Sequence, residues 1–322
     1  MKVISSWLLI SSLQLTTASL QAQPEVSVAH FQGGRQAAVS YTFDDGLLDQ
    51  YTLAYPELRK RGLRATFAVI GSKVGGIVHS SQDRAMGISG TPCMTWAMLR
   101  EMAEGGQEIT SHGWEHKKVT KLTPEQLRYE VQHNDTVIFC ETGHFPRSYV
   151  YPGNGRDSAT IRFCEHDRVG SRLFQISIGA KRDSAWLSQW IEGLIERGEW
   201  GIGMTHGIAT GYDHFPDPQV LWSHFDYITT RLEHVWVAPF CEVAAYVRER
   251  DDVKLTVSRR GRTTLVNIST TLDPHIFNVP LTLQISDRPK RITQDRHKLK
   301  PYTKNGVTLV DIDPHGGQIR IN

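Results

Sequence analysis

Short apolar runs alternate with stretches of helical periodicity over residues 37–250. This alternation predicts parallel strands joined by helical crossovers. Several runs are almost continuously apolar, as expected of strands that are buried on both faces of a sheet. Seven strands are predicted, at residues 37–43, 65–70, 108–111, 149–151, 169–172, 201–205 and 235–238. The pattern favours an α/β domain with a parallel sheet.

Helix signals lie between these runs. A helix is predicted to begin at Pro124, because Thr123 is a good N-cap and Gln126 completes a capping box. Two more crossover helices are predicted. One carries Trp186, Trp190, Leu194 and Ile195 at helical spacing before Gly198, and the other covers residues 241–250 and ends in basic residues.

The pattern changes after residue 250 to strand-like alternation without a helical period. Strands are predicted at residues 253–258, 263–269, 279–285, 307–312 and 319–321, separated by Gly, Asn, Asp and Pro. Residues 251–322 therefore form a small antiparallel β domain in this interpretation. Its histidines are scattered, so we expect a packing or glycan-contact role for it.

The chain begins with Met1-Lys2, continues with a mostly apolar run and then reaches the small residue Ala22, which is a signal-peptide pattern over residues 1–22. An uncleaved membrane anchor is the alternative. We expect a secreted or periplasmic protein with no stable membrane insertion after cleavage. The domains are then 1–22 as signal peptide, 23–250 as the α/β domain and 251–322 as the β-rich accessory domain.

Composition narrows the class of protein. Hydrophobic residues make up 39% and charged residues 22% of the 322 residues, which favours a soluble globule over a disordered or multi-pass membrane protein. The net charge of +2 provides no large field for binding nucleic acid. The four cysteines can pair in three ways in an oxidising compartment, or remain as buried free thiols.

Asp44 and Asp45 are adjacent carboxylates where a predicted strand ends before Gly46. Neighbours on a strand point to opposite sides, so one carboxylate can bind a metal while the other accepts a proton, provided that a bend at Gly46 turns both toward one ligand. A capped Asp-Gly turn is the simpler interpretation. His112 and His116 follow another strand four residues apart, and two imidazoles with a carboxylate are a catalytic zinc ligand set.

His206 follows a third strand, in Thr205-His206-Gly207. A histidine there can donate a proton to a leaving group, although a hydrogen-bonded strand-end histidine is the plainer alternative. Because parallel α/β folds gather their sites at the C-terminal ends of strands, we expect the three stretches to converge.

Taken together, the motifs resemble those of the polysaccharide deacetylase family, which carries the NodB homology domain. The resemblance rests on Thr42-Phe-Asp-Asp-Gly46, Ser111-His-x-x-x-His116 and Thr205-His206-Gly207, and covers about residues 37–250. It implies a distorted seven-stranded (β/α) barrel. It also implies an acetylated oligo- or polysaccharide substrate and a divalent metal ion, zinc by default, with cobalt or nickel as alternatives.

The resemblance also assigns roles to residues. Asp45, His112 and His116 would bind the metal, Asp44 would be the catalytic base and His206 the catalytic acid.

The third motif departs from the family pattern. Val150 stands where an arginine usually braces the base, so Arg147 or Arg172 would have to substitute, or the base is less firmly held. Tyr151, Pro152 and Gly153 match the loop expected to line the acyl pocket and to supply an oxyanion N–H. For the motif that precedes the late histidine, Arg182, Asp183 and Trp186 are the nearest matches.

The loop at residues 71–92 is expected to shape the substrate groove. Residues 206–218 form its opposite wall in one interpretation and a polar, solvent-facing loop in the alternative. The leading hypothesis is an N-deacetylase of an N-acetylated glycan. The alternatives are an O-acetyl polysaccharide esterase and a catalytically weak carbohydrate-binding protein. The oligomeric state is left open.

Overall fold

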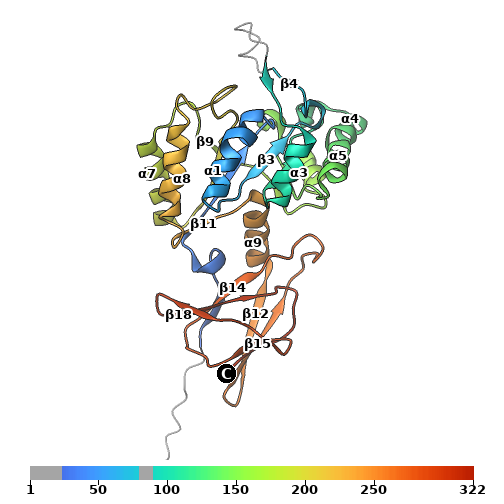
Figure 1. The fold of residues 1–322 in the computed structure, drawn as a ribbon. Coiled ribbons are helices and arrows are strands. Elements are labelled where there is room, and N and C mark those ends of the chain that lie inside the picture. The colour runs from blue at the N-terminus through green and yellow to red at the C-terminus, as the bar shows by residue number, and fades with distance from the viewer. Residues whose placement is uncertain (1–23, 80–89) are drawn as a thin grey trace, which may run out of the picture.

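A curled parallel sheet organises the larger part of the protein (Figure 1). The computed structural model describes residues 24–79 and 90–322, and the predicted signal peptide at residues 1–22 lies outside them. All seven predicted strands are present: β2 (Ala37–Phe43), β3 (Thr66–Val69), β6 (Glu108–Ser111), β7 (Ser148–Tyr149), β8 (Gly170–Ser171), β10 (Trp200–Thr205) and β11 (Val235–Val237). The prediction missed β9 (Ile176–Ser177), whose two residues provide no periodic signal.

The strand order is β8-β7-β6-β3-β2-β10-β9, with β11 also paired to β2. One edge of β2 pairs with β10. On the other edge, β11 pairs with the first three residues of β2 and β3 pairs with its last two. Because two strands share one edge of β2, the sheet curls instead of lying flat. The predicted distorted (β/α) barrel is confirmed.

Helices cover the outer face of this sheet (Figure 1). They are α1 (Tyr55–Lys60), α3 (Trp96–Glu104), α4 (Pro124–Arg128), α5 (Asn134–Thr142), α6 (Ser158–Cys164), α7 (Ser184–Arg197), α8 (Gln219–Thr229) and α9 (Phe240–Asp252). Both predicted helix boundaries are confirmed. Thr123 and Gln126 form the capping box of α4, and Gly198 ends α7 in a left-handed conformation.

Several short helical turns complete the loops. The 3-10 turns are η1 (Gln32–Gly34), η3 (Gly71–Lys73), η4 (Val119–Lys121) and η6 (Pro152–Asn154). Two π-helical turns, η2 (Gln50–Ala54) and η5 (Tyr129–His133), precede α1 and α5. Such π turns are uncommon and often accompany functional sites.

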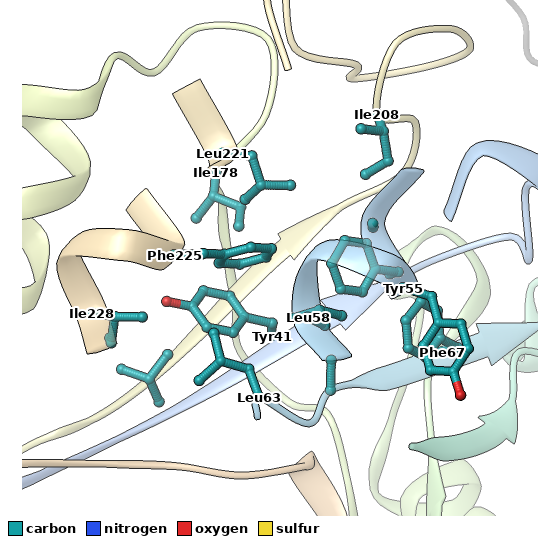
Figure 2. Packing of buried hydrophobic residues seen from close by; sticks show 14 of the residues in the cluster. Tyr41, Tyr55, Leu58, Leu63, Phe67, Ile178, Ile208, Leu221, Phe225 and Ile228 are labelled. Atoms are coloured by element: carbon teal, nitrogen blue, oxygen red, sulfur yellow. The ribbon is translucent and has the colours of Figure 1, made fainter. Parts of the chain in front are cut away.

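Aromatic residues fill the space between the sheet and its helices (Figure 2). The ring of Tyr41 from β2 meets that of Phe225 from α8 edge-on, with centroids 5.2 Å apart. Phe43 stacks on Phe67 of the next strand at 4.9 Å. Each fully buried side chain of this size contributes about 1.5–3 kcal/mol of hydrophobic stabilisation, which fixes the strands that carry the site.

The C-terminal part is a two-sheet β sandwich. One sheet has the order β1-β14-β18-β17 and the other β12-β13-β19-β15-β16. The strands are β1 (Val26–Val28), β12 (Lys254–Arg260), β13 (Thr263–Ser269), β14 (Leu281–Ile285), β15 (Ile292–Gln294), β16 (His297–Lys298), β17 (Tyr302–Lys304), β18 (Val307–Ile312) and β19 (Ile319–Ile321). All five predicted strands are present, and the short strands β15, β16 and β17 were missed.

The sandwich and the barrel share one hydrophobic cluster. Trp236 of β11 and Tyr246 of α9 pack with Leu283 and Val310 of the sandwich. The N-terminal strand β1 also pairs with β14, although the sequence pattern assigned it to the barrel region. The proposed division at residue 250 stays a prediction.

The described residues include all four cysteines, and each of them is free. Three are buried, which matches the second alternative left open by the sequence. Within residues 24–79 and 90–322, no helix is long and apolar enough to cross a membrane. The hairpin of β4 (Ile77–Val78) and β5 (Thr91–Pro92) brackets residues 80–89, which are not described.

Candidate active site

The three sequence motifs converge because their strands are neighbours in the sheet. Thr205 of β10 pairs with Phe43 of β2, and the backbone N–H of Asp44 donates to the Thr205 carbonyl at 3.0 Å. On the other side, the N–H of His112 donates to the carbonyl of Val69. The carboxylates and histidines therefore meet at the C-terminal edge of the sheet, where parallel α/β folds place their sites.

Asp45, His112 and His116 form a cluster of three candidate metal ligands. The Nε2 atoms of the two histidines are 3.2 Å apart, and Oδ1 of Asp45 lies 3.5 Å from the first and 3.7 Å from the second. Three ligands of a tetrahedral zinc ion, each about 2.0–2.1 Å from the metal, lie about 3.3 Å from one another. The observed triangle fits a metal of this size.

The electronic state of His112 supports the same interpretation. Its Nδ1 lies 2.9 Å from the carbonyl oxygen of Val150, so Nδ1 carries the proton and the Nε2 lone pair faces the cluster. Burial lowers the pKa of His112 to about 4, which keeps the imidazole neutral at pH 7. The buried Oδ1 of Asp45 has no hydrogen-bond donor among the described residues, as expected of an atom reserved for a cation.

Two ligands occupy backbone conformations that are uncommon for residues with a side chain. Asp45 has φ 72° and His116 has φ 61°. A left-handed conformation at non-glycine residues is held by the surrounding structure and is concentrated at functional sites. The necessary bend was predicted at Gly46, and in the structure both Asp45 and Gly46, which has φ 71°, form it.

Glu130 holds the loop between the two histidines. Its carboxylate accepts hydrogen bonds from the backbone N–H groups of Glu115 and Lys117, at 2.8–3.1 Å. A Cβ atom on Gly113 would lie 2.4 Å from Oε1 of Glu130, so only glycine leaves room for this contact. Glu130 is 1% exposed and lies on the π turn η5. Glu130 was not predicted, because a lone glutamate in a helix carries no motif.

Arg172 binds the carboxylate of Asp44 through two parallel hydrogen bonds. Nη1 lies 2.7 Å from Oδ1 and Nη2 lies 2.5 Å from Oδ2. Burial raises the pKa of Asp44, but the guanidinium more than offsets burial, so the pKa lies well below its usual range. Of the two arginines left open by the sequence, Arg172 braces Asp44, whereas Arg147 donates to the Ile276 carbonyl beside the sandwich.

His206 enters the site from the end of β10. Its ring meets the Tyr212 ring edge-on, with centroids 4.9 Å apart, and its Nδ1 has no hydrogen-bond partner among the described residues. The side-chain amide of buried Gln50, on the π turn η2, donates to the carbonyls of both Asp44 and His206, at 2.6 and 2.8 Å. This single residue therefore ties together the loops that follow β2 and β10.

Asp49 fixes the backbone beyond His206. One of its carboxylate oxygens accepts hydrogen bonds from the N–H groups of Ile208, Ala209 and Thr210, at 2.8–3.2 Å. Neither Asp49 nor Gln50 was predicted, since both bond to backbone atoms more than 150 residues away, in the segment that follows β10. Only the folded chain brings them together.

These residues open into a cleft of about 1210 Å³. Tyr151 and Gly153 line it, whereas Pro152 is buried and is not among the lining residues. Lys73 and Ile77 from the first predicted groove loop, and Tyr212 from the second, also face the cleft. The role of the 151–153 loop stays a prediction.

The candidates for the late motif have different positions. Arg182 lines the cleft, with its guanidinium 3.8 Å from the centre of the Trp186 ring. Asp183 is the N-cap of α7 and accepts a hydrogen bond from the Trp186 N–H. Trp186 and Asp183 therefore have structural partners that account for them.

Comparison with known proteins agrees with this geometry. Residues 32–166 match the family model described as polysaccharide deacetylase. Over this segment, the chain is similar to the polysaccharide deacetylase family. The matched segment contains Asp44, Asp45, His112 and His116, while Arg172 and His206 lie beyond its end.

Two curated relatives match part of this chain. YxkH of Bacillus subtilis, whose name assigns it provisionally to the polysaccharide deacetylases, is 34% identical over 131 residues, or 40% of this chain and 42% of that protein. Peptidoglycan-N-acetylglucosamine deacetylase PgdA of Listeria monocytogenes is 25% identical over 115 residues, or 35% of this chain and 21% of that protein. The alignments thus span less than half of each relative.

Among solved structures, the Bc1960 peptidoglycan N-acetylglucosamine deacetylase is similar to 65% of this chain, over 88% of its own length. The sequence identity is 14% and the TM-score is 0.47.

Proposed function

We propose that this protein is a metal-dependent hydrolase that removes acetyl groups from a carbohydrate, by N-deacetylation of an N-acetylated glycan. The observation that carries the proposal is the position of the Arg172-bound Asp44 directly beside the three-ligand cluster. A charged base next to a metal site with an open position is the arrangement needed to hydrolyse an amide or ester.

Asp45, His112 and His116 would hold the metal. When bound, a divalent ion lowers the pKa of its water toward about 7 and polarises an acyl carbonyl. Zinc is the proposed ion because two imidazoles and one carboxylate suit it, and cobalt or nickel fit the same set.

The remaining steps belong to side chains of the chain itself. Asp44 is proposed to take a proton from the attacking water, because Arg172 keeps its carboxylate ionised and oriented. His206 is proposed to protonate the departing nitrogen, using a ring that projects into the cleft. A backbone N–H of the 151–153 loop is proposed to donate to the oxyanion, with Tyr151 lining the acetyl pocket.

An extracellular or periplasmic location, following cleavage of residues 1–22, is part of the proposal. Support comes from the N-terminal sequence pattern alone.

Acetate release tests the proposal. The purified protein is given N-acetylglucosamine oligomers and, separately, acetylated xylan, before and after chelation and zinc restoration. We expect metal-restorable acetate from the N-acetylated oligomers and its loss in Asp44→Asn with zinc still bound. Asp287→Asn, an exposed substitution in the sandwich, is the matched control and should leave activity unchanged. Acetate released only from xylan would show an O-acetyl esterase and contradict N-deacetylation. No acetate from either substrate would contradict the whole proposal.

A further inference from the structure

One face of the β sandwich carries positive charge and no acidic group. Twelve lysines and arginines but only seven aspartates lie within residues 251–322, an excess of five positive charges, whereas the whole chain has a net charge of +2. The barrel region is therefore acidic on balance and the sandwich is basic. Such asymmetry is a physical reason to look for an anionic partner.

The strand register places much of this charge on one surface. In an antiparallel sheet, directly paired residues lie on the same face. The pairs Ser258↔Leu265, Leu265↔Arg320, Arg320↔Thr293 and Thr293↔Lys298 therefore form a continuous row across the five strands. Neighbouring strands are about 4.8 Å apart, so Arg320 and Lys298 stand about 10 Å apart along this row.

Alternation along β12 extends the same face. Lys254 and Arg260 are an even number of residues from Ser258, so they project to its side, and both are exposed. They lie about 20 Å apart along the strand. Leu255 and Val257 point the other way, into the core shared with the second sheet. The basic sheet face is defined here by Lys254, Arg260, Lys298 and Arg320.

The rest of this face is polar except for the half-buried Leu265. It consists of Thr256, Ser258, Thr263, Leu265, Asn267, Ser269 and Thr293. Among the described residues, none of the four cations forms an ion pair with an acidic side chain. The bordering acids have hydrogen-bond partners of their own: Asp252 accepts from the Thr270 and Thr271 hydroxyls, and Asp295 from the Gly317 N–H. Asp252 also interacts electrostatically with Lys254, without forming an ion pair.

We infer that the basic sheet face binds an anionic polysaccharide. Its lack of aromatic side chains disfavours sugar-ring stacking, which neutral glycans would require, and base stacking, which single-stranded nucleic acids use. It also lacks the apolar anchors of a membrane-inserting surface. Cations spread over a flat, hydroxyl-rich surface about 20 Å long suit an extended polymer that bears repeated carboxylates and hydroxyls.

The face lies far from the cleft. Figure 1 shows β12 and β15 at the opposite end of the molecule from β4, whose residues Ile77 and Val78 line the cleft. The basic sheet face would therefore hold one part of a polysaccharide while a different part of it, or a neighbouring polysaccharide molecule, reaches the cleft. The charge pattern by itself supports the binding of an anionic polymer. Only the choice of a glycan as that polymer rests on the proposed function.

Binding of sodium polygalacturonate to the full chain tests the inference, with unsubstituted xylan, double-stranded DNA and vesicles of equal phosphatidylcholine and phosphatidylserine as comparison probes. We expect salt-sensitive binding to the polyuronate that Arg260→Gln with Arg320→Gln weakens by about tenfold. Lys121→Gln with Arg162→Gln removes the same charge from exposed barrel positions and should change binding by less than about twofold. Thermal unfolding confirms that both variants fold.

Equal loss in both variants would overturn the inference, since it would show an effect of net charge alone. Tighter binding to DNA or to vesicles than to the polyuronate would overturn the choice of partner, and so would absence of polyuronate binding by the wild type. Acetate release from small N-acetylated oligomers, measured in the same preparations, keeps the two hypotheses separate: an inactive protein that still binds polyuronate contradicts only the proposed function.

Discussion

Arg172 and Asp44, separated by 128 positions in the chain, form a buried bidentate ion pair beside the candidate metal site. Arg172 follows β8 at the edge of the sheet and Asp44 follows the central strand β2. Because the sheet curls, the guanidinium of Arg172 reaches Asp44, and it also donates to the hydroxyl of Thr42 at 2.7 Å. Arg172 thus supplies, from a distant part of the chain, the positive charge that Val150 does not provide in the third motif.

Replacing Arg172 with lysine should impair the base without emptying the site. Lysine keeps the charge but not the paired hydrogen bonds, so we expect kcat/KM to fall by about 10- to 100-fold. Weaker stabilisation of the carboxylate raises the pKa of Asp44, and because the ionised form is the base, the acidic limb of the pH–rate profile moves to higher pH.

The pH–rate profile with saturating zinc measures this effect. Arg147→Lys, at an arginine that does not contact Asp44, is the control and should keep the wild-type profile. An unchanged acidic limb in Arg172→Lys would show that the ion pair does not tune the base.

Removing one ligand should weaken metal binding. Asp45→Asn replaces the only carboxylate of the cluster, so we expect zinc affinity to fall by about 100-fold or more and the zinc-dependent rise in Tm to disappear. Isothermal titration calorimetry and thermal unfolding measure the two effects. Asp44→Asn is the matched neighbour and should keep zinc affinity, so a similar loss in both variants would count against the assigned division of roles.

Glu130 should matter for metal affinity although it touches no metal. Glu130→Ala removes the acceptor for the N–H groups of Glu115 and Lys117 and frees the loop that carries His116. We expect zinc affinity to fall by about 10- to 100-fold, whereas Glu130→Gln, which keeps one carbonyl acceptor, should lose less. Titration with zinc alone is the measurement. Glu125→Ala, an exposed change on α4, is the control, and wild-type affinity in Glu130→Ala would contradict the role.

Glu249 should make stability depend on pH. It is 0% exposed, and one carboxylate oxygen accepts only the Val279 N–H. The other has no hydrogen-bond partner among the described residues and lies 3.9 Å from Nε2 of His315. Burial raises the pKa of Glu249 from 4.5 to about 7. Because the folded pKa lies above the unfolded one, the folded state binds the extra proton, and stability falls as pH rises from about 4.5 to 7.

Glu249→Gln should remove this dependence. Relative to the wild type, we expect the variant to gain about 1–2 kcal/mol between pH 4.5 and 8, after allowance for screening by solvent. Urea unfolding at several pH values measures the difference. Glu104→Gln, at an exposed position, should follow the wild-type curve, and parallel curves for Glu249→Gln would refute the assignment.

Much of the barrel was predictable because its signals are local. The parallel strands are near-continuous apolar runs, and the start of α4 at Pro124 is a capping box contained within four residues. Asp45, His112 and His116 were also found from sequence, because each follows a strand and parallel strand ends meet at one edge. Strands of two or three residues, such as β9 and β16, carry too few residues to show a period.

The sequence by itself determined the fold class, the three strand-end motifs and the candidate ligand set. Only the tertiary structure decided that Arg172 and not Arg147 holds Asp44, that Gln50 joins the loops of Asp44 and His206, and that β1 pairs with the C-terminal sandwich. The physical reason is that these contacts join residues distant in sequence, often through backbone atoms that every residue type possesses. No local pattern encodes such partners, and they are specified only when the packed core brings the strands into register.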